Sequence, residues 1–322
     1  MRAISTSTSS VNWSLPYNSP LHFKRITLED IPEINRILRQ SSSLTCDYSI
    51  GGIYMWIDYF RYRYCIYDDT LFIMGVEENH VDRVAFSCPI GKMPLVNAIR
   101  LLKDYCKERN IPLRFSAVPA DRLVCFSTFN SDCRVEELTD WSDYVYEITS
   151  FATLSGKKMS KKRNHVNRFM ADHPAAMLEP LTADNLNEVI KSFNEWCESK
   201  EEENGQSTRA EERREVLDVL FNLDKLPFEG AILREEKGGK IVGFTLAEPI
   251  NDTLFVHIEK MDHRVSGAGE TLAHLFSAMM SERHPEIVYL NREEDCGDEG
   301  LRYAKESWHP AMLLKKYNVE SL

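Results

Sequence analysis

Apolar and polar residues recur along the chain in two blocks, each with the periods of strands and helices. In the first block an alternating strand at 21–26 precedes Thr27, which with Asp30 forms an acidic capping box for a helix over 31–38. The block continues with expected strands at 63–67, 70–76 and 84–87, a helix at 95–106 and a strand at 113–117. This order predicts an α/β (α+β) layered fold rather than a helix bundle.

The second block repeats this order of elements. We expect a strand at 144–148, helices at 157–170 and 185–199, strands at 231–235, 241–248, 254–260 and 287–291, and a helix that begins at 270. The charge-rich segment 201–215 is expected to be a solvated connection. The pattern predicts a flexible N-terminus at 1–20, an N-terminal domain at 21–140 and a C-terminal domain at 141–322.

Composition narrows the class of protein. The net charge of −11 argues against a protein that coats nucleic acid, although a local basic site remains compatible with it. Because no apolar run reaches the ~20 residues of a membrane span, we expect no integral membrane association. The eight cysteines show no zinc spacing, and residues 1–20 contain no secretory apolar region. The chain is therefore predicted to be cytoplasmic and to hold no metal.

The segment from Arg264 to Gly269 has the spacing R-x-x-G-x-G, between the strand at 254–260 and the helix that begins at 270. Unpaired backbone N–H groups at a helix start attract anions, and glycines let the backbone approach a phosphate. The candidate cofactor-binding residues are Arg264, Val265, Ser266, Gly267, Ala268 and Gly269. The spacing resembles the pyrophosphate loop of the GNAT acyltransferases, which implies coenzyme A or acetyl-CoA as donor. The alternative is a glycine-rich turn that caps an ordinary helix.

Three further residues are candidates for the same site. Resemblance to GNAT proteins places Asn291, at the end of the strand at 287–291, beside the cofactor, and gives Tyr303 the role of protonating the departing thiolate. Glu259, on the strand beside the thioester, is a candidate general base for an acceptor amine. The alternatives are a tyrosine packed on a helix face and an ordinary ion-paired glutamate.

Basic residues are concentrated in the expected helix at 157–170. The candidate phosphate-binding side chains are Lys157, Lys161, Lys162 and Arg163, with Lys158 and Arg168 nearby. Six cations within an acidic chain favour a helix that faces a cofactor tail, a tRNA end or another anion. The alternative is a solvated helix that balances nearby acids.

Several runs resemble one bacterial family. They are D-Y-V-Y at 143–146, G-K-K-M-S-K-K-R-N-H-V-N-R-F at 156–169, H-I-E-K at 257–260 and N-R-E-E-D-C-G-D-E-G-L-R at 291–302, followed by W-H-P. They are similar to uncharacterised bacterial proteins grouped with the C-terminal domain of phosphatidylglycerol lysyltransferase. This resemblance implies two tandem GNAT-like folds, as in the peptidoglycan-bridge aminoacyltransferases, whose acyl group arrives on aminoacyl-tRNA.

Three functions follow from these observations. The first is an N-acyltransferase that moves an acyl group from a coenzyme A thioester to a small-molecule or peptide amine by direct attack. The second is an aminoacyl-tRNA-dependent aminoacyltransferase on the same scaffold. The third is a non-catalytic module that binds an anionic ligand.

Overall fold

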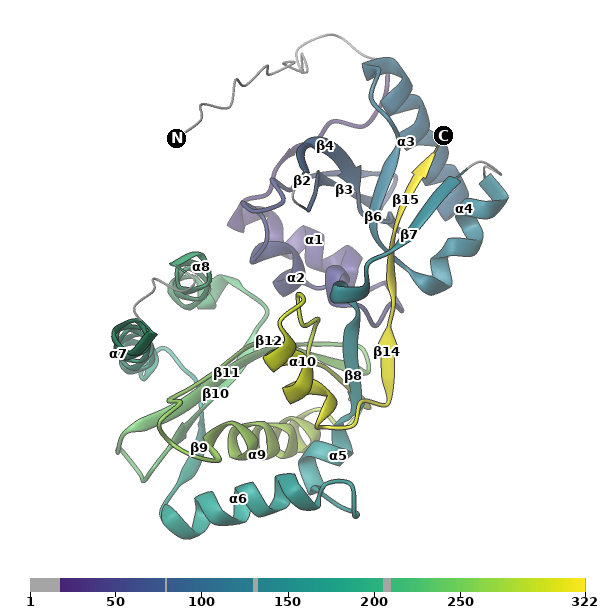
Figure 1. The fold of residues 1–322 in the computed structure, drawn as a ribbon. Coiled ribbons are helices and arrows are strands. Elements are labelled where there is room, and N and C mark those ends of the chain that lie inside the picture. The colour runs from purple at the N-terminus through teal and green to yellow at the C-terminus, as the bar shows by residue number, and fades with distance from the viewer. Residues whose placement is uncertain (1–17, 79, 130–132, 205–209, 322) are drawn as a thin grey trace.

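The computed structural model describes residues 18–78, 80–129, 133–204 and 210–321. Among these residues the strands form two sheets, one in each half of the chain (Figure 1). The first seventeen residues of the expected flexible N-terminus lie outside the described residues.

The first sheet has eight strands. Its main order is β1 (Lys24–Arg25), β2 (Arg63–Tyr67), β3 (Thr70–Glu77), β4 (His80–Phe86), β6 (Arg114–Pro119), β15 (Lys316–Ser321) and β7 (Cys133–Glu137), and β5 (Ile90–Gly91) pairs with β3. The helices of this half are α1 (Ile31–Leu38), α2 (Ile50–Tyr54), α3 (Leu95–Arg109) and α4 (Leu123–Phe129). Asp68 and Asp69 form the hairpin turn between the expected strands β2 and β3, with φ values of 48° and 52°.

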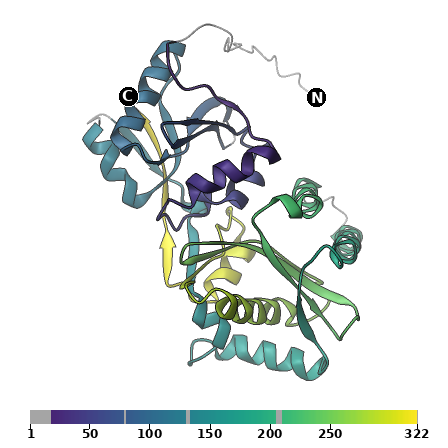
Figure 2. The ribbon, with the colours of Figure 1, turned by 180° about the vertical axis from the view of Figure 1, so that it is seen from behind.

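The second sheet has seven strands. Their order is β14 (Met312–Leu314), β8 (Asp143–Glu147), β13 (Tyr289–Asn291), β12 (Thr253–Met261), β11 (Ile241–Ile250), β10 (Glu229–Arg234) and β9 (Met177–Pro180). The helices are α5 (Ile148–Thr153), α6 (Ser160–Asp172), α7 (Leu186–Asn204), α8 (Ala210–Phe221), α9 (Ala268–Arg283) and α10 (Glu299–Glu306). In both views α7 and α8 lie on one face of this sheet, and α6 and α9 lie on the other (Figures 1 and 2).

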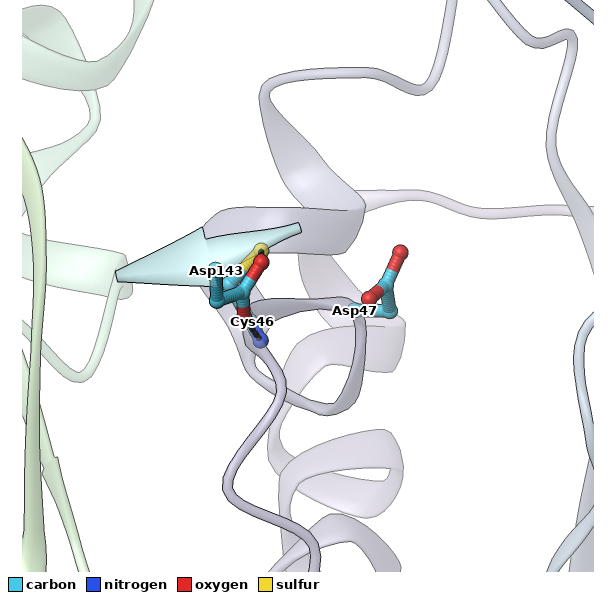
Figure 3. Close-up of side chains that lie close together, drawn as sticks. All are labelled: Cys46, Asp47 and Asp143. Carbon is cyan, nitrogen blue, oxygen red and sulfur yellow. Dashed lines mark hydrogen bonds between the residues drawn. The ribbon is translucent and has the colours of Figure 1, made fainter. Parts of the chain in front are cut away.

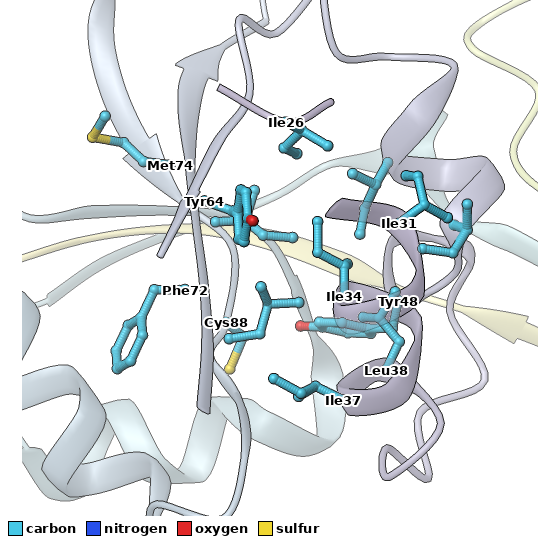
Figure 4. Close-up of a cluster of buried hydrophobic side chains, with 14 of the residues drawn as sticks. Ile26, Ile31, Ile34, Ile37, Leu38, Tyr48, Tyr64, Phe72, Met74 and Cys88 are labelled. Atoms are coloured by element: carbon cyan, nitrogen blue, oxygen red, sulfur yellow. The ribbon is translucent and has the colours of Figure 1, made fainter. Parts of the chain in front are cut away.

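Apolar periodicity accounts for the first-half core. The side chains of Ile31, Ile34, Ile37 and Leu38 lie on one face of α1 and are buried. They pack toward Tyr64 and the neighbouring strands (Figure 4). The same apolar cluster continues through α2 to the α7–α8 face of the second sheet, so one core joins the two halves.

The segment 201–215 differs from its expected form as a solvated connection. Residues 201–204 continue α7 and residues 210–215 begin α8, while 205–209 lie outside the described residues. Burial of Val216, Val219 and Leu220 against the sheet explains this second helix, because these side chains recur at helical spacing.

The last strand returns to the first sheet. β15 lies between β6 and β7, antiparallel to both, although the expected division at residue 140 gave residues 316–321 to the C-terminal domain. Only Lys315 separates it from β14, which is paired with β8 in the second sheet. The chain end therefore connects the two sheets directly (Figure 1).

Candidate functional site

A cavity of about 830 Å³ opens where two parallel strands diverge. β12 and β13 pair over only three positions, the last of which is Phe255 with Asn291. Beyond that pair β12 continues to Met261, and β13 gives way to the loop at 292–298. The cavity lies between these segments and is also lined by Gly269 at the start of α9, by α10, and by Met55 and Trp56 from the first half.

Carboxylates outnumber cations in the cavity lining. The acidic lining residues are Glu212, Glu215, Glu259, Glu270, Glu293, Glu294, Asp295 and Asp298. The basic ones are Lys162, Lys260, Arg292 and Lys305. Eight acidic side chains outnumber these four cations and the one lining histidine, His257, so the cavity has an excess of acidic groups, which favours a cationic ligand group over an anionic one.

His257 lies in the cavity wall between two glutamates. Its Nδ1 is 2.7 Å from Glu293 Oε1 and its Nε2 is 3.3 Å from Glu248 Oε2. Burial alone would lower the pKa of His257, but hydrogen bonds to Glu248 and Glu293 raise it to about 9. Gly51 of α2 covers the ring so closely that a Cβ there would lie 2.3 Å from it. The imidazolium therefore joins β12 to the first half of the chain.

Glu259, the predicted general base, lines the cavity and is paired with a cation. Its Oε1 accepts a hydrogen bond from Arg292 Nη2 at 2.9 Å. The guanidinium of Arg292 lies 5.6 Å and 5.8 Å from the ring centroids of Phe151 and Trp308, which stack on each other at 4.1 Å. This packing fixes the position of Arg292 and, through it, of the Glu259 carboxylate.

The predicted phosphate loop is engaged largely within the protein. Arg264 Nε and Nη2 donate to the buried carboxylate of Asp262 at 2.8 Å and 2.9 Å, and the Arg264 N–H also donates to it. Gly267 has a φ of 82°, and a Cβ there would lie 2.9 Å from the carbonyl oxygen of His165 in α6. A glycine at this position therefore allows the start of α9 to pack closely against α6.

The other loop residues have different surroundings. Val265 is partly buried, Ala268 is fully buried and Ser266 is exposed. Of the six predicted loop residues, Gly269 is the one that lines the cavity. α6 therefore covers Gly267 and Asp262 holds Arg264, while Gly269 has access to the cavity.

Asn291 and Tyr303 lie outside the cavity lining. Asn291 is fully buried, and its Nδ2 donates to Leu44 O at 2.7 Å and to Asp143 Oδ2 at 2.8 Å. Its Oδ1 accepts from the backbone N–H of Glu293, so the residue shapes the loop after β13. Tyr303 is 74% exposed on α10.

The four basic candidates are divided among three environments. Lys162 is buried and lines the cavity, where its Nζ lies 3.3 Å from Glu270 Oε1. Arg163 donates to the carbonyl oxygens of Leu154 and Gly156, which holds the turn before α6. Lys157 and Lys161 are exposed at that end of α6.

Sequence reasoning did not identify a buried charge cluster beside the cavity. Lys316 Nζ lies 2.6 Å from Asp143 Oδ1, 2.7 Å from Asp47 Oδ2 and 3.5 Å from Glu294 Oε2. Burial raises the pKa of Glu294 to about 7, although Lys316 opposes that rise. Only the acidic run at 293–299 could have pointed to this cluster, because its partners are distant in the sequence.

Cys46, Asp47 and Asp143 offer metal-type donors within 4.8 Å of one another (Figure 3). The Lys316 ammonium already occupies the space between the two carboxylates, so these residues do not fit a metal ion. Among the described residues, this is the one group of metal-type donors, and no helix has both the length and the apolar character to cross a membrane.

Comparisons with known proteins identify relatives of this chain. The model of the family described as phosphatidylglycerol lysyltransferase, C-terminal, matches residues 38–320. A conserved protein of unknown function from Bacteroides thetaiotaomicron VPI-5482 is 30% identical, with a TM-score of 0.85 over 94% of this chain and 100% of that one. An uncharacterised protein of Mycoplasmoides gallisepticum is 24% identical over 190 residues, and the match spans 56% of this chain and 56% of that protein.

More distant solved structures share the fold. L-PGS from Bacillus licheniformis is 15% identical, with a TM-score of 0.57 over 81% of this chain and 84% of that one. FemX is 11% identical, with a TM-score of 0.58 over 94% and 97% of the two chains. With the two sheets, these likenesses confirm the predicted mixed α/β protein of two tandem GNAT-like folds.

Proposed function

Because this chain belongs to the family of phosphatidylglycerol lysyltransferase C-terminal domains, we propose that it transfers an aminoacyl group from aminoacyl-tRNA to an amine acceptor. The donor ester would enter the cavity between the diverging ends of β12 and β13. The acceptor amine would approach from the side formed by Met55 and Trp56, which belong to the first half of the chain.

The excess of carboxylates in the cavity is the observation that carries this proposal. An aminoacyl ester has a free α-ammonium group, which a lining of eight acidic side chains against four lysines and arginines and one histidine would attract. Coenzyme A instead carries several phosphate charges, and the same lining would repel them. Arg264, the loop residue expected to bind the coenzyme A pyrophosphate, is already paired with Asp262.

Exposed lysines beside the cavity supply a surface for the phosphates of tRNA. Lys157 and Lys158 lie in the turn that precedes α6, and Lys161 lies in its first turn, next to the cavity residue Lys162. Within the described part of the chain, none of the three forms an ion pair. Their charge is therefore available to an anionic backbone, which suits the positive surface that nucleic-acid binding needs.

We assign the proton transfer to Glu294. The acceptor nitrogen attacks the ester carbonyl, a C–N bond forms, the C–O bond to the ribose breaks, and the amine proton passes through Glu294 to the ribose oxygen. A general base works best when its pKa is close to the working pH, and burial brings that of Glu294 to about 7. Glu259 would orient the donor through Arg292, and the exposed Tyr303 has no part in the proposed step.

Salt-dependent binding of aminoacyl-tRNA tests the donor. We expect the variant with Lys157, Lys158 and Lys161 all changed to Ala to bind bacterial aminoacyl-tRNA more weakly. Loss of three phosphate contacts should reduce the log–log salt slope by about 2. Transfer is then measured as labelled amino acid that moves from the ester into an amide of an added amine.

A matched control variant tests whether the position of the three lysines matters, or only the loss of three positive charges. Lys92, Lys107 and Lys237 are exposed and do not belong to the N-terminal end of α6, so changing all three to Ala removes the same charge elsewhere. This control should bind aminoacyl-tRNA as the wild type does. Equal losses in both triple variants, or no binding by the wild type, would refute the aminoacyl-tRNA donor.

One observation favours an acyl-coenzyme A donor as the second candidate. Gly269 lines the cavity at the start of α9, where a glycine allows close backbone approach. The three atoms nearest to a Cβ there all belong to the flexible side chain of Met261, so we expect Gly269→Asp to fold. Coenzyme A at 100 times its Kd would stabilise the wild type by about 2.7 kcal/mol in thermal unfolding. A shift seen in the wild type and absent from Gly269→Asp would favour this donor.

A further inference from the structure

A second cavity, of about 220 Å³, lies on the first sheet. Its floor is formed by β3, β4 and β6, and its walls include Phe60, Tyr62 and Trp141. Cavities that hold whole cofactors or drug-sized ligands usually measure 300–1,000 Å³. This one therefore has room for a single small group rather than for coenzyme A or a nucleotide.

Aromatic rings form one side of this cavity. Phe60 stacks on Tyr62 with centroids 5.4 Å apart, and it meets Trp141 edge-on at 5.8 Å. The ring centroid of Trp56, which lines the larger cavity, lies 5.9 Å from that of Trp141, so the linings of the two cavities meet at this pair of indoles. Ring faces carry partial negative charge and attract cations.

A carboxylate without a cationic partner lines the same cavity. Glu78 Oε2 accepts a hydrogen bond from Trp141 Nε1 at 2.6 Å, and within the described part of the chain it has no ion pair. Burial raises the pKa of Glu78. The neighbouring Glu77 is instead paired with Arg83, and Asp47 is paired with Lys316.

An unsatisfied acceptor also lies in the lining. Asn318 of β15 has a buried Oδ1 with no hydrogen-bond partner among the described residues. Burying such an atom is costly unless a donor meets it. An ammonium group carries three N–H donors, which is enough for Asn318, Glu78 and one further acceptor.

We propose that this cavity binds the ammonium group of a small alkylamine, with the cation against the rings and its N–H groups on Glu78 and Asn318. The observations behind it are the aromatic wall, the unpaired carboxylate, the unsatisfied amide oxygen and the small volume. The lining of this site shares no residue with the cavity assigned to the donor. It therefore goes beyond the proposed transfer and does not depend on it.

Calorimetric titration of the full chain with propylammonium chloride tests the site. We expect saturable binding that an equal concentration of 1-propanol or of sodium chloride does not reproduce. Glu78→Gln keeps an acceptor for Trp141 and removes the charge, so binding should weaken about tenfold or more, as expected for loss of a charge-assisted hydrogen bond. The exposed Glu236→Gln is the matched control and should bind as the wild type does.

Two results would overturn the ammonium site directly. The first is an absence of saturable propylammonium binding to the folded wild type, and the second is unchanged binding by Glu78→Gln. Binding of 1-propanol as tight as that of propylammonium would point to a merely apolar cavity and would overturn the proposal too. No tRNA or acyl donor is present in the titration, so failure of the proposed transferase activity would leave the result unaffected.

Discussion

His257 shows how a single buried side chain can hold elements from both halves together. Two glutamates contact its ring nitrogens, Glu293 from the loop after β13 and Glu248 from β11, and the rings of Phe228 and Phe255 lie nearby. Glu248 also accepts a hydrogen bond from the backbone N–H of Gly51. The charged imidazolium therefore stabilises a contact that crosses between the halves.

The first prediction concerns the pH dependence of this contact. The folded-state pKa of about 9 lies above the ordinary value of 6.5, so the stabilisation is complete below about pH 6.5 and is lost as the pH rises through 9. A difference of 2.5 pKa units corresponds to at most about 3.4 kcal/mol. Urea unfolding of wild type and His257→Gln should show a free-energy difference that shrinks by roughly this amount between pH 6 and pH 10.

An exposed histidine supplies the control for that experiment. His22→Gln alters a solvent-exposed ring, so its small effect on the free energy of unfolding should not follow this pH dependence. A wild type–His257→Gln difference that stays constant across the range would contradict a charged His257.

The second prediction assigns the general base of the proposed reaction. Glu294→Gln should lower kcat by about 10²-fold and remove the rise of rate near pH 7, since the amide cannot accept the proton. Glu259→Gln should weaken the Arg292 contact and act mainly on KM. The measurement is a pH–rate profile for both variants. If Glu294→Gln keeps the wild-type profile, Glu294 is not the general base.

These two glutamates show what could be predicted at the residue scale. Glu259 lies on a strand recognisable from its alternating pattern, so its position beside a cavity could be predicted. Glu294 lies in the acidic run after β13. The surroundings of its carboxylate include Lys316 and Cys46, which are 22 and 248 residues away in the sequence. Because these partners are distant in the sequence, the residues around Glu294 do not indicate that its carboxylate is buried.

At the scale of elements, Gly267 determines how α9 meets α6. It precedes the first residue of α9 with φ of 82°, and its Cα faces the backbone of α6 at His165. The R-x-x-G-x-G spacing alone was compatible with both a phosphate loop and a helix-capping turn. The close contact with α6 supports a structural role for this glycine, while Gly269 keeps access to the cavity.

The third prediction compares Gly267 with Gly156, a glycine that has the same φ angle. Gly156 also has φ of 82°, but a Cβ there would meet no atom within 4 Å. Both Ala variants carry the left-handed strain of about 1 kcal/mol, and Gly267→Ala adds a steric cost of roughly 1–3 kcal/mol from the 2.9 Å approach to His165 O. Chemical denaturation should therefore rank Gly267→Ala as the less stable variant. Equal stabilities would indicate that α6 does not cover the loop.

The elements that could be predicted are those with their own periodicity. β2, β3 and α3 have strong patterns, and the structure places them within a few residues of the expected bounds. β7, β14 and β15 were not expected, because each is defined by its pairing rather than by its own pattern. Strand propensity depends on such neighbours more than helix propensity does.

At the scale of the whole molecule, the chain end connects the two tandem folds. β15 completes the first sheet, and its first residue, Lys316, places an ammonium between Asp143 of β8 and Asp47 of the first half. Burial alone would lower the pKa of Lys316, but these carboxylates raise it well above its ordinary value. This cation therefore acts together with the shared apolar core and His257 to hold the two halves, and no local pattern could reveal it.

The fourth prediction is that Lys316→Met destabilises the whole protein in a pH-dependent way. Removal of the cation leaves Asp47, Asp143 and Glu294 buried without their counter-charge, which costs roughly 3–5 kcal/mol. Met fills a similar volume, so the loss is electrostatic. The neighbouring Lys315→Met removes a partly exposed pair with Glu137 and should cost less than about 1 kcal/mol.

The sign of the pH dependence follows from the carboxylates. Glu294 has a folded pKa of about 7 against an ordinary 4.5, so its protonated form is favoured in the fold and stability falls as the pH rises from about 4.5 through 7. Without Lys316 its pKa would rise further, and the same loss would extend to higher pH. Denaturation of wild type, Lys316→Met and Lys315→Met at pH 5 and pH 8 should show a wild type–Lys316→Met gap that is larger at pH 8. A gap that is equal at both pH values, or is matched by Lys315→Met, would mean that the halves are held by apolar packing rather than by this buried ammonium.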